Sequence, residues 1–171
     1  MKKWFIFLIM CMLGLTSLHA QKFAYVDTKY ILENIPEYQQ ALNSLDELSL
    51  QWQKELEQKY AEIDKLYKAY QNEAFLLTDE MKKKRQDEII NKEKEAKELQ
   101  KKYFGAEGEL FKKRQELIKP IQDKVYDAIE KLATEGNYAI IFDRAGSTTV
   151  IYANEKFDKS DEVLQRLGYK K

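Results

Sequence analysis

The side chains that most often carry out catalysis or bind metals are nearly missing from this chain. It holds one cysteine and one histidine, Cys11 and His19, and both lie within the first twenty residues. Thiol nucleophiles, disulfides, Cys/His metal sites and histidine acid–base chemistry all need these side chains. Because the remaining 151 residues (171 minus 20) have neither, we predict no enzyme, no catalytic residues, no metal site and no cofactor.

Two carboxylates each follow a strand-like segment. Asp27 and Asp143 would form a metal-binding pair if the two strands were neighbours. The alternative is that each carboxylate caps a turn or a helix at the end of its strand, as Asp side chains commonly do. We favour the capping role.

Residues 1–20 have the composition of a secretory signal peptide. Lys2 and Lys3 precede an apolar run over residues 4–15, and Ala20 is a small residue at the expected cleavage point. The run is shorter than the ~20 residues that span a bilayer, so a retained anchor is the less favoured alternative. A lipoprotein signal at Cys11 fits less well still. We therefore predict export and cleavage near residue 20.

Residues 37–133 are predicted to form a long antiparallel α-helical hairpin. Between residues 37 and 132 there are one proline and two glycines, and apolar side chains recur at spacings of three and four. This repeat of 3.5 residues keeps one apolar stripe against a partner helix, as in a coiled coil. In the first arm the stripe comprises Tyr38, Leu42, Leu45, Trp52, Leu56, Ile63, Leu66, Tyr70 and Leu77.

The second arm repeats the pattern and should pack against the first. It has apolar residues at intervals of seven: Ile89, Ala96, Tyr103, Leu110 and Leu117. Gly105 and Gly108 each disfavour a helix by about 1 kcal/mol relative to alanine, and Pro120 removes a backbone donor. We expect the arm to flex or kink at these places.

The turn of the hairpin is predicted near residues 75–81, with Thr78 capping the second helix. Four apolar side chains lie there: Phe75, Leu76, Leu77 and Met81. Such a tip has little neighbouring protein, so two interpretations stay open. These side chains either close the seam between the helices or contact a client protein.

Charge is divided unevenly between the arms. Residues 37–77 carry four basic and eight acidic side chains, whereas residues 78–134 carry fifteen basic and thirteen acidic ones. Opposite net charges favour pairing of the arms.

A basic cluster follows the predicted turn and comprises Lys82, Lys83, Lys84 and Arg85. It is either a solvated helix turn or an electrostatic contact for anionic clients or lipid. Without residues 1–20 the chain has 27 basic and 29 acidic residues, which gives no indication of nucleic-acid binding.

Residues 21–36 and 134–171 are predicted to form a small β-rich platform, giving an α+β fold with the hairpin inserted. Strands are expected at residues 22–27, 137–143 and 148–152, the last two joined as a β-hairpin. Gly136 is expected to end the long helix, and a last helix is expected at 160–167, capped by Ser160 and closed by Gly168. The platform has too few residues for a large core, so we expect oligomerisation. The predicted oligomerisation core comprises Phe23, Tyr25, Val26, Ile140, Ile141, Phe142, Val150 and Ile151.

The order of these parts resembles the Skp/OmpH family of periplasmic chaperones. The resemblance runs from residues 23–27 through the hairpin to residues 117–121, 138–143 and 163–164. It implies a periplasmic homotrimer in which three platforms join and three hairpins project as tentacles around a cavity. That cavity would hold unfolded outer-membrane proteins, without ATP, until their assembly in the membrane.

The expected function is therefore that of a holdase chaperone for unfolded outer-membrane β-barrel proteins. Weak contact with anionic lipid is a further expectation from the basic cluster, and no nucleic-acid partner is expected. The alternative is a structural periplasmic adaptor whose hairpin docks onto an envelope or channel complex. Such adaptors generally carry larger β-rich domains, so the short strand segments favour the chaperone.

Overall fold

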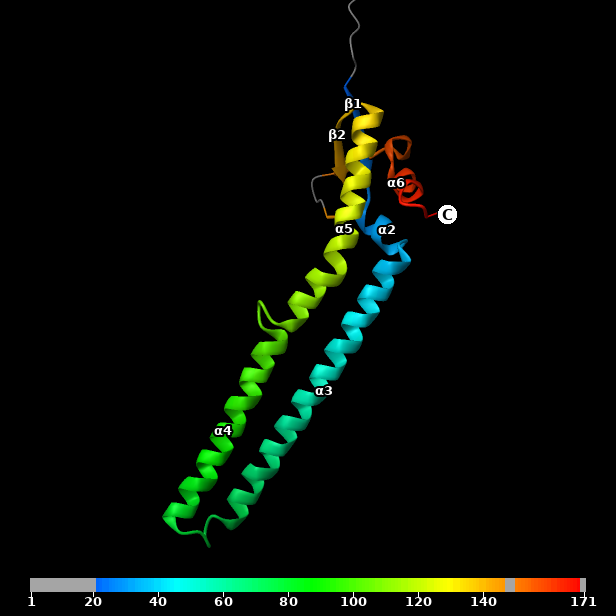
Figure 1. Ribbon diagram of the computed structural model, residues 1–171. Helices are drawn as coiled ribbons and strands as arrows, with labels where there is room; N and C mark the ends of the chain where they lie inside the picture. The colour runs from blue at the N-terminus through cyan, green and yellow to red at the C-terminus, as the bar shows by residue number, and fades with distance from the viewer. Residues whose placement is uncertain (1–20, 147–149, 170–171) are drawn as a thin grey trace, which may run out of the picture. The chain divides into compact units, whose positions relative to one another are not determined.

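The computed structural model describes residues 21–146 and 150–169 (Figure 1). Their elements are β1 (Lys22–Val26), α2 (Thr28–Glu33), α3 (Pro36–Glu73), α4 (Asp79–Phe104), α5 (Glu109–Gly136), β2 (Tyr138–Asp143), η1 (Glu155–Phe157) and α6 (Ser160–Arg166). The chain divides into two compact units, one of residues 31–126 and one of the residues up to 30 and from 127 onward. The predicted signal peptide lies outside the described residues. Within the described ones, no helix is long and apolar enough to cross a membrane.

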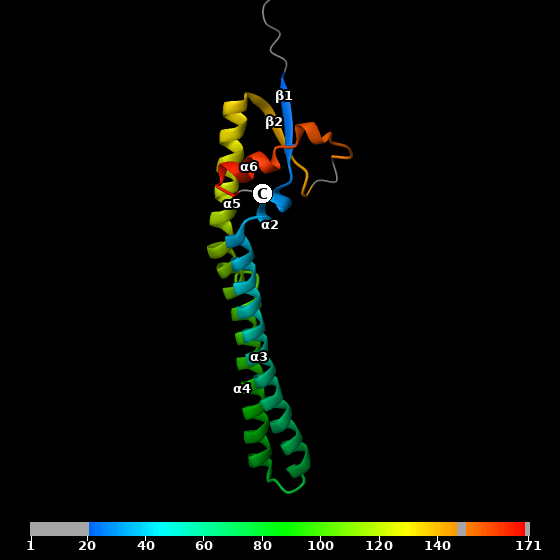
Figure 2. The same ribbon diagram turned by 90° about the vertical axis from the view of Figure 1, so that its right-hand side faces the viewer.

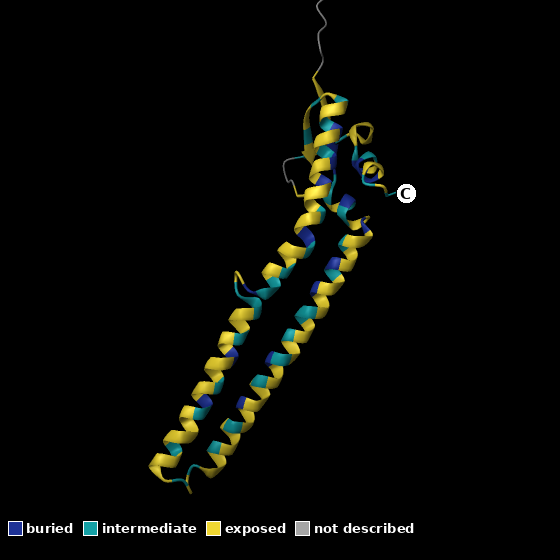
Figure 3. Cartoon of the chain, viewed as in Figure 1, coloured by how far each residue is buried: buried dark blue, intermediate teal, exposed yellow. Residues whose placement is uncertain are grey.

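In the first unit, α3 and α4 run side by side in opposite directions (Figures 1 and 2). Every residue of the stripe predicted for the first arm is buried or half-buried. Figure 3 shows the buried positions of the two helices along the sides that face each other. The predicted helical hairpin, and with it the α+β fold class, is confirmed.

The ends of the two long helices follow local signals in the sequence. Pro36 occupies the first turn of α3, where its missing N–H is not needed. The Thr78 side chain accepts a hydrogen bond of 3.3 Å from the backbone N–H of Met81 and caps α4, as predicted. Asp79 and Glu80 in the first turn of α4 match the positive end of its helix dipole.

The second arm is broken, not merely flexed, between α4 and α5. Residues 105–108 are not helical, and Gly105 has the extended values φ −63° and ψ 167°. A Cβ on Gly105 would overlap the carbonyl oxygen of Lys101, and one on Gly108 would stand 2.8 Å from the carbonyl oxygens of Lys102 and Tyr103. Glycine is thus required at both positions, because any side chain would collide with a backbone carbonyl oxygen. Pro120, by contrast, lies inside α5 without ending it.

An aromatic cluster adjoins this break. The rings of Trp52 and Tyr103 stack with centroids 4.8 Å apart and an angle of 6°, and the Phe104 ring meets both edge-on. The Tyr103 hydroxyl donates a hydrogen bond of 2.9 Å to the Glu55 carboxylate. The cluster divides the seam into two apolar parts. One joins Ile63 to Ile89 and Ala96; the other joins Ala41 and Leu45 to Ile118.

The other unit contains a two-stranded parallel sheet. β1 pairs with β2 from Lys22 opposite Tyr138 to Val26 opposite Asp143, and the register shifts after the first pair. Its buried apolar side chains come from β1, from the last turns of α5 and from α6: Ala24, Tyr25, Val26, Ala128, Leu132, Val163 and Leu164. Gly136 ends α5, as predicted.

The predicted third strand, and the β-hairpin it would form, are wrong for the residues described. Val150, Ile151 and Tyr152 are not in a strand, while residues 148 and 149 lie outside the described part of the chain. Ile151 is 97% exposed and Tyr152 is 82% exposed. β-Propensity alone does not make a strand, because the backbone also needs a neighbouring row of hydrogen-bonding groups.

The capping role predicted for Ser160 is also wrong. Lys159 occupies the cap position of α6, and the Ser160 hydroxyl instead accepts a 2.8 Å hydrogen bond from the Asp27 backbone N–H. The same hydroxyl donates to the Asp158 carboxylate over 2.6 Å. Ser160 therefore links the end of β1 to the start of α6. Gly168 closes α6 as predicted, with φ of 91°.

We predict that Gly105→Ala destabilises the protein by about 1–2 kcal/mol, because the added methyl group overlaps the Lys101 carbonyl oxygen. Urea unfolding followed by circular dichroism measures this. Gly146→Ala is the matched control, since a Cβ there meets nothing within 4 Å. A rise in stability of Gly105→Ala would contradict the prediction and indicate that the break closes into a continuous helix.

Candidate functional site

The tip of the hairpin leaves apolar side chains uncovered. Phe75 is 80% exposed, Leu76 is 73% exposed and Met81 is 51% exposed. Leu77, the last residue of the seam pattern, is half-buried. Of the two interpretations of this tip, closure of the seam therefore fits Leu77. The other three side chains are presented to solvent, where they can contact another molecule.

The basic cluster occupies the first turns of α4, directly after the tip. Lys82 lies 3.6 Å from the Asp79 carboxylate, and Arg85 makes a 3.2 Å ion pair with Glu88. Lys83 and Lys84 are exposed. Surface ion pairs of this kind contribute little stability, ~1 kcal/mol or less each. The acidic neighbours compensate much of the positive charge of the cluster.

The residues predicted as an oligomerisation core differ in their burial. Tyr25 and Val26 are buried within the chain itself, and Ile141 and Val150 are half-buried. Four others expose large apolar area: Phe23 (44%), Ile140 (48%), Phe142 (46%) and Ile151 (97%). Of the predicted core, these four side chains have the largest exposed fractions with which to meet another subunit.

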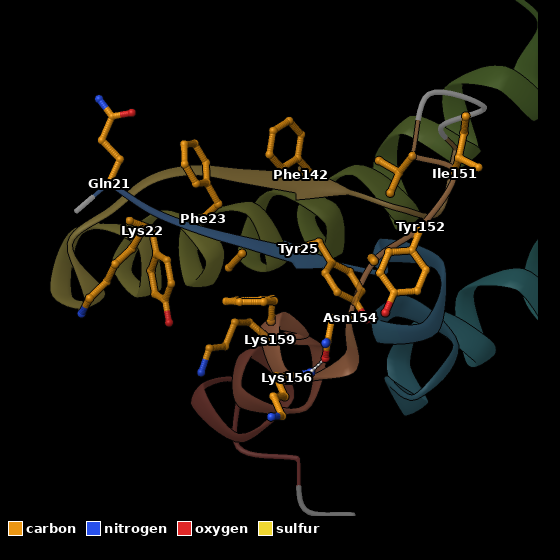
Figure 4. Close-up of a pocket in the computed structure, with 15 residues that line it drawn as sticks. Gln21, Lys22, Phe23, Tyr25, Phe142, Ile151, Tyr152, Asn154, Lys156 and Lys159 are labelled. Carbon is orange, nitrogen blue, oxygen red and sulfur yellow. Dashed lines mark hydrogen bonds between the residues drawn. The ribbon is translucent and has the colours of Figure 1, made fainter.

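A groove of about 1110 Å³ is lined by three of these four residues, Phe23, Phe142 and Ile151 (Figure 4). Phe23 and Phe142 project from the two strands to the same side, and Ile151, Tyr152 and Phe157 extend the lining. Lys22 lies at one end, where its ammonium group donates to the Gly136 carbonyl oxygen and stands 6.0 Å from the centre of the Tyr138 ring. The groove is mainly apolar and open to solvent, which suits a protein surface better than a small polar ligand.

Asp27 and Asp143 both act as caps. The Asp143 carboxylate accepts hydrogen bonds from the backbone N–H of Thr28 (3.1 Å), the hydroxyl of Thr28 (2.7 Å) and the backbone N–H of Ala145 (3.0 Å). Asp27 accepts from the backbone N–H of Tyr30 over 2.9 Å. Within residues 21–146 and 150–169, no group of three or more His, Cys, Asp or Glu side chains is arranged to hold a metal ion.

These hydrogen bonds change the acidity of Asp143. Burial alone would raise its pKa, but the three donors stabilise the charged carboxylate more strongly, so the pKa lies below its ordinary value. Tyr25 shows the opposite case, because burial and then the nearby Asp158 carboxylate raise the pKa of its hydroxyl. Both groups lie where the strands end, and the Asp143 carboxylate joins Thr28 to Ala145 there.

The sequence patterns missed further exposed apolar residues. Leu50, Tyr60 and Tyr67 of α3 and Ile90 of α4 lie outside the seam and are 65%, 42%, 50% and 58% exposed. Their signal was present in the sequence, since each falls at a position that the heptad pattern assigns to solvent. They indicate a contact surface only as a group, because single exposed apolar residues are common.

A chain that combines a two-helix hairpin with an uncovered apolar tip and a small sheet with an apolar groove has the features of a protein that works by contacting other polypeptides. The chain belongs to the family described as outer membrane protein (OmpH-like), whose sequence description matches residues 22–167. This membership supports a chaperone role.

Two individual proteins resemble this chain over most of its length. An uncharacterised protein of Aquifex aeolicus (strain VF5) is 28% identical over 145 residues, which cover 85% of each chain. A crystal structure from Caulobacter crescentus CB15, described as a candidate outer membrane chaperone (OmpH-like), superposes with a TM-score of 0.69. It shares 13% identity and is matched over 88% of this chain and 86% of its own, so it shows a common fold.

We predict that Asp143→Asn destabilises the protein at pH 7 and has a smaller effect in acid. The folded pKa is lowered, so the carboxylate stabilises the fold fully above its unfolded pKa of ~3.9 and loses this contribution as the pH falls through the folded value. Urea unfolding at pH 7 and near pH 3 measures the difference. The exposed Asp87→Asn on α4 is the control. An equal effect of Asp143→Asn at both pH values would contradict the prediction.

Proposed function

We propose that this protein is an ATP-independent periplasmic holdase, which binds unfolded outer-membrane β-barrel proteins and prevents their aggregation before membrane assembly. The observation that carries the proposal is the exposure of Phe75, Leu76 and Met81 at a hairpin tip that has no core in which to bury them. Membership of the OmpH-like family supports the same function. The proposal involves no catalysis and no cofactor.

The hairpin is chemically suited to such clients. Strands of outer-membrane barrels alternate apolar and polar residues, so an unfolded client offers both kinds of contact along its length. The hairpin offers apolar side chains separated by charged and amide ones, as at Phe75, Leu76 and the basic cluster. Many weak contacts hold a chain without selecting one sequence, and they let it leave without an energy source.

We assign the two parts of the chain different roles in this function. Residues 37–133 form the client-binding hairpin, and residues 21–36 with 134–171 form the oligomerisation platform. Residues 1–20 act as a cleaved signal peptide that exports the protein to the periplasm. Lys82, Lys83, Lys84 and Arg85 make electrostatic contact with anionic clients and weak contact with anionic lipid.

The platform joins three subunits into a homotrimer, with the client held between the hairpins. Support comes from the apolar groove and from the exposed Phe23, Ile140, Phe142 and Ile151, whose burial against a neighbouring subunit would stabilise both. The outer edge of β2 adds hydrogen-bonding groups, since its one strand partner in the described part of the chain is β1.

The client contact is tested at the tip. Phe75→Ser combined with Leu76→Ser should raise the protein concentration needed to suppress aggregation of an unfolded porin by about tenfold, because each side chain contributes up to ~1.5–3 kcal/mol when buried. Light scattering after dilution of the porin from urea measures this. Tyr126→Ser removes an aromatic side chain that is 68% exposed elsewhere and should change little. A lower melting temperature with unaltered protection would instead assign the tip to the seam.

The homotrimer is tested in the platform. Ile140→Ser combined with Phe142→Ser should shift the sedimentation mass from three chains towards one, since both side chains are about half-exposed in the single chain and would lose their apolar partners in the interface. Ile90→Ser, at a comparably exposed position of α4, should leave the mass unchanged. A wild-type protein that sediments as a monomer would refute the trimer itself.

A further inference from the structure

The two broad sides of the hairpin, on either side of the seam, can be told apart by contacts between α3 and α4. The Tyr60 hydroxyl lies 3.2 Å from the Gln100 side-chain oxygen, and the Gln86 amide donates to the Tyr70 hydroxyl over 2.8 Å. Gln86 and Gln100 therefore lie on the side of α4 that Tyr60 faces. On the other side of the seam, Lys92 approaches Glu62 over 3.5 Å.

Helix periodicity extends this side along both helices. Residues three and four apart share a helix face. On α3 such steps lead from Leu50 through residues 53 and 57 to Tyr60, and on through residue 64 to Tyr67. On α4 they lead from Gln86 to Ile90 and through residues 93 and 97 to Gln100. We call the side that carries Leu50, Tyr60, Tyr67 and Ile90 the tyrosine face.

The exposed apolar side chains of the hairpin are not shared equally between its sides. The four residues of the tyrosine face are 42–65% exposed. On the opposite side, the corresponding steps pass through Glu55, Glu62, Lys65 and Asn72 of α3 and Glu88, Asn91, Glu95 and Glu98 of α4. Between the tip and the break, no large exposed apolar side chain lies on that opposite side of the described helices.

We infer that the tyrosine face is the surface on which the hairpin binds an unfolded polypeptide of alternating apolar and polar residues. The inference rests on the proposed chaperone function and assigns it to one side of the hairpin. Tyr60 and Tyr67 suit this partner because a tyrosine ring covers apolar groups while its hydroxyl meets a polar one. They stand seven residues apart, which is about 10 Å along the helix, so an extended chain can reach both.

A second copy of the hairpin fits this surface less well. Four side chains, each about half-exposed, offer roughly 400 Å² of apolar area, whereas a stable interface buries about 800 Å² on each partner. The seam shows what helix pairing needs, namely apolar residues at every third or fourth position, and the tyrosine face lacks this. Asp64 pairs with Lys68 over 2.7 Å, and Glu57 and Glu93 still outweigh Lys97. The face therefore keeps a negative balance, which disfavours an anionic lipid surface.

The test exchanges the two sides without changing the composition of the chain. Leu50→Gln with Gln51→Leu, Tyr67→Asn with Asn72→Tyr, and Ile90→Asn with Asn91→Ile move three apolar side chains off the tyrosine face. Gln51, Asn72 and Asn91 are exposed, so the exchanges leave the seam untouched. The exchanged protein and the wild type are compared for affinity towards a porin diluted from urea, and for helix content and sedimentation mass.

We expect the exchanged protein to bind the unfolded porin about tenfold more weakly, with helix content and mass unaltered. Equal affinity of the two proteins would overturn the assignment of the tyrosine face while leaving the chaperone function standing. A changed mass would overturn it in favour of contact between copies of this chain. Failure of the wild type itself to bind the porin would reject the proposed function, and the assignment with it.

Discussion

Two helices that lie side by side can bury only the stripe of each that faces the other. In this hairpin the stripe runs the length of α3, whose 38 residues extend about 57 Å at 1.5 Å per residue. Most of the circumference of each helix therefore faces solvent. The stability of the hairpin depends on a single row of buried side chains, such as Leu45, Leu56 and Ile63. Apolar residues outside that line bury little surface within the hairpin, so a group of them on one side is suited to contact with another molecule.

The break between α4 and α5 follows from the same constraint. When apolar residues recur at strict intervals of seven, the apolar stripe rotates around a straight α-helix by about 20° per heptad. The stripe therefore turns away from a straight partner helix. α4 meets α3 through Ile89 and Ala96, but α5 meets it through Ile118 beside Leu117. Gly105 and Gly108 let the chain leave one helix and start the next, and in α5 Ile118 joins Leu117 of the seven-residue repeat in the seam. The stacked rings of Trp52 and Tyr103 fill the place where the two apolar parts of the seam would otherwise separate.

Local and periodic signals are sufficient to predict the hairpin, the Thr78 cap and the end of α5 at Gly136, because each depends on residues close together in the sequence. From the sequence, the break between α4 and α5 could be predicted only as a flexible place. Helix propensity gives the free-energy cost of the two glycines, but not the path of the backbone between them. The strand predicted at residues 148–152 is wrong for residues 150–152: β2 pairs not with this neighbouring segment but with β1, far earlier in the chain. The cap predicted at Ser160 is wrong because the Ser160 hydroxyl accepts a hydrogen bond from the backbone N–H of Asp27, 133 residues away. The heptad pattern places residues such as Tyr60 and Ile90 outside the seam, but the side of the hairpin that they share depends on how α3 and α4 pair.

The position of Trp52 has a spectroscopic consequence. Trp4 and Trp52 are the two tryptophans of the chain, so a protein without residues 1–20 has one indole, and that indole stacks on Tyr103 beside the break. Indole emission shifts with the polarity of its surroundings, and a half-buried ring in an aromatic stack emits differently from one in water. The fluorescence of the native protein thus reports, without any label, whether the two parts of the second arm keep their places against α3 when an unfolded polypeptide is added.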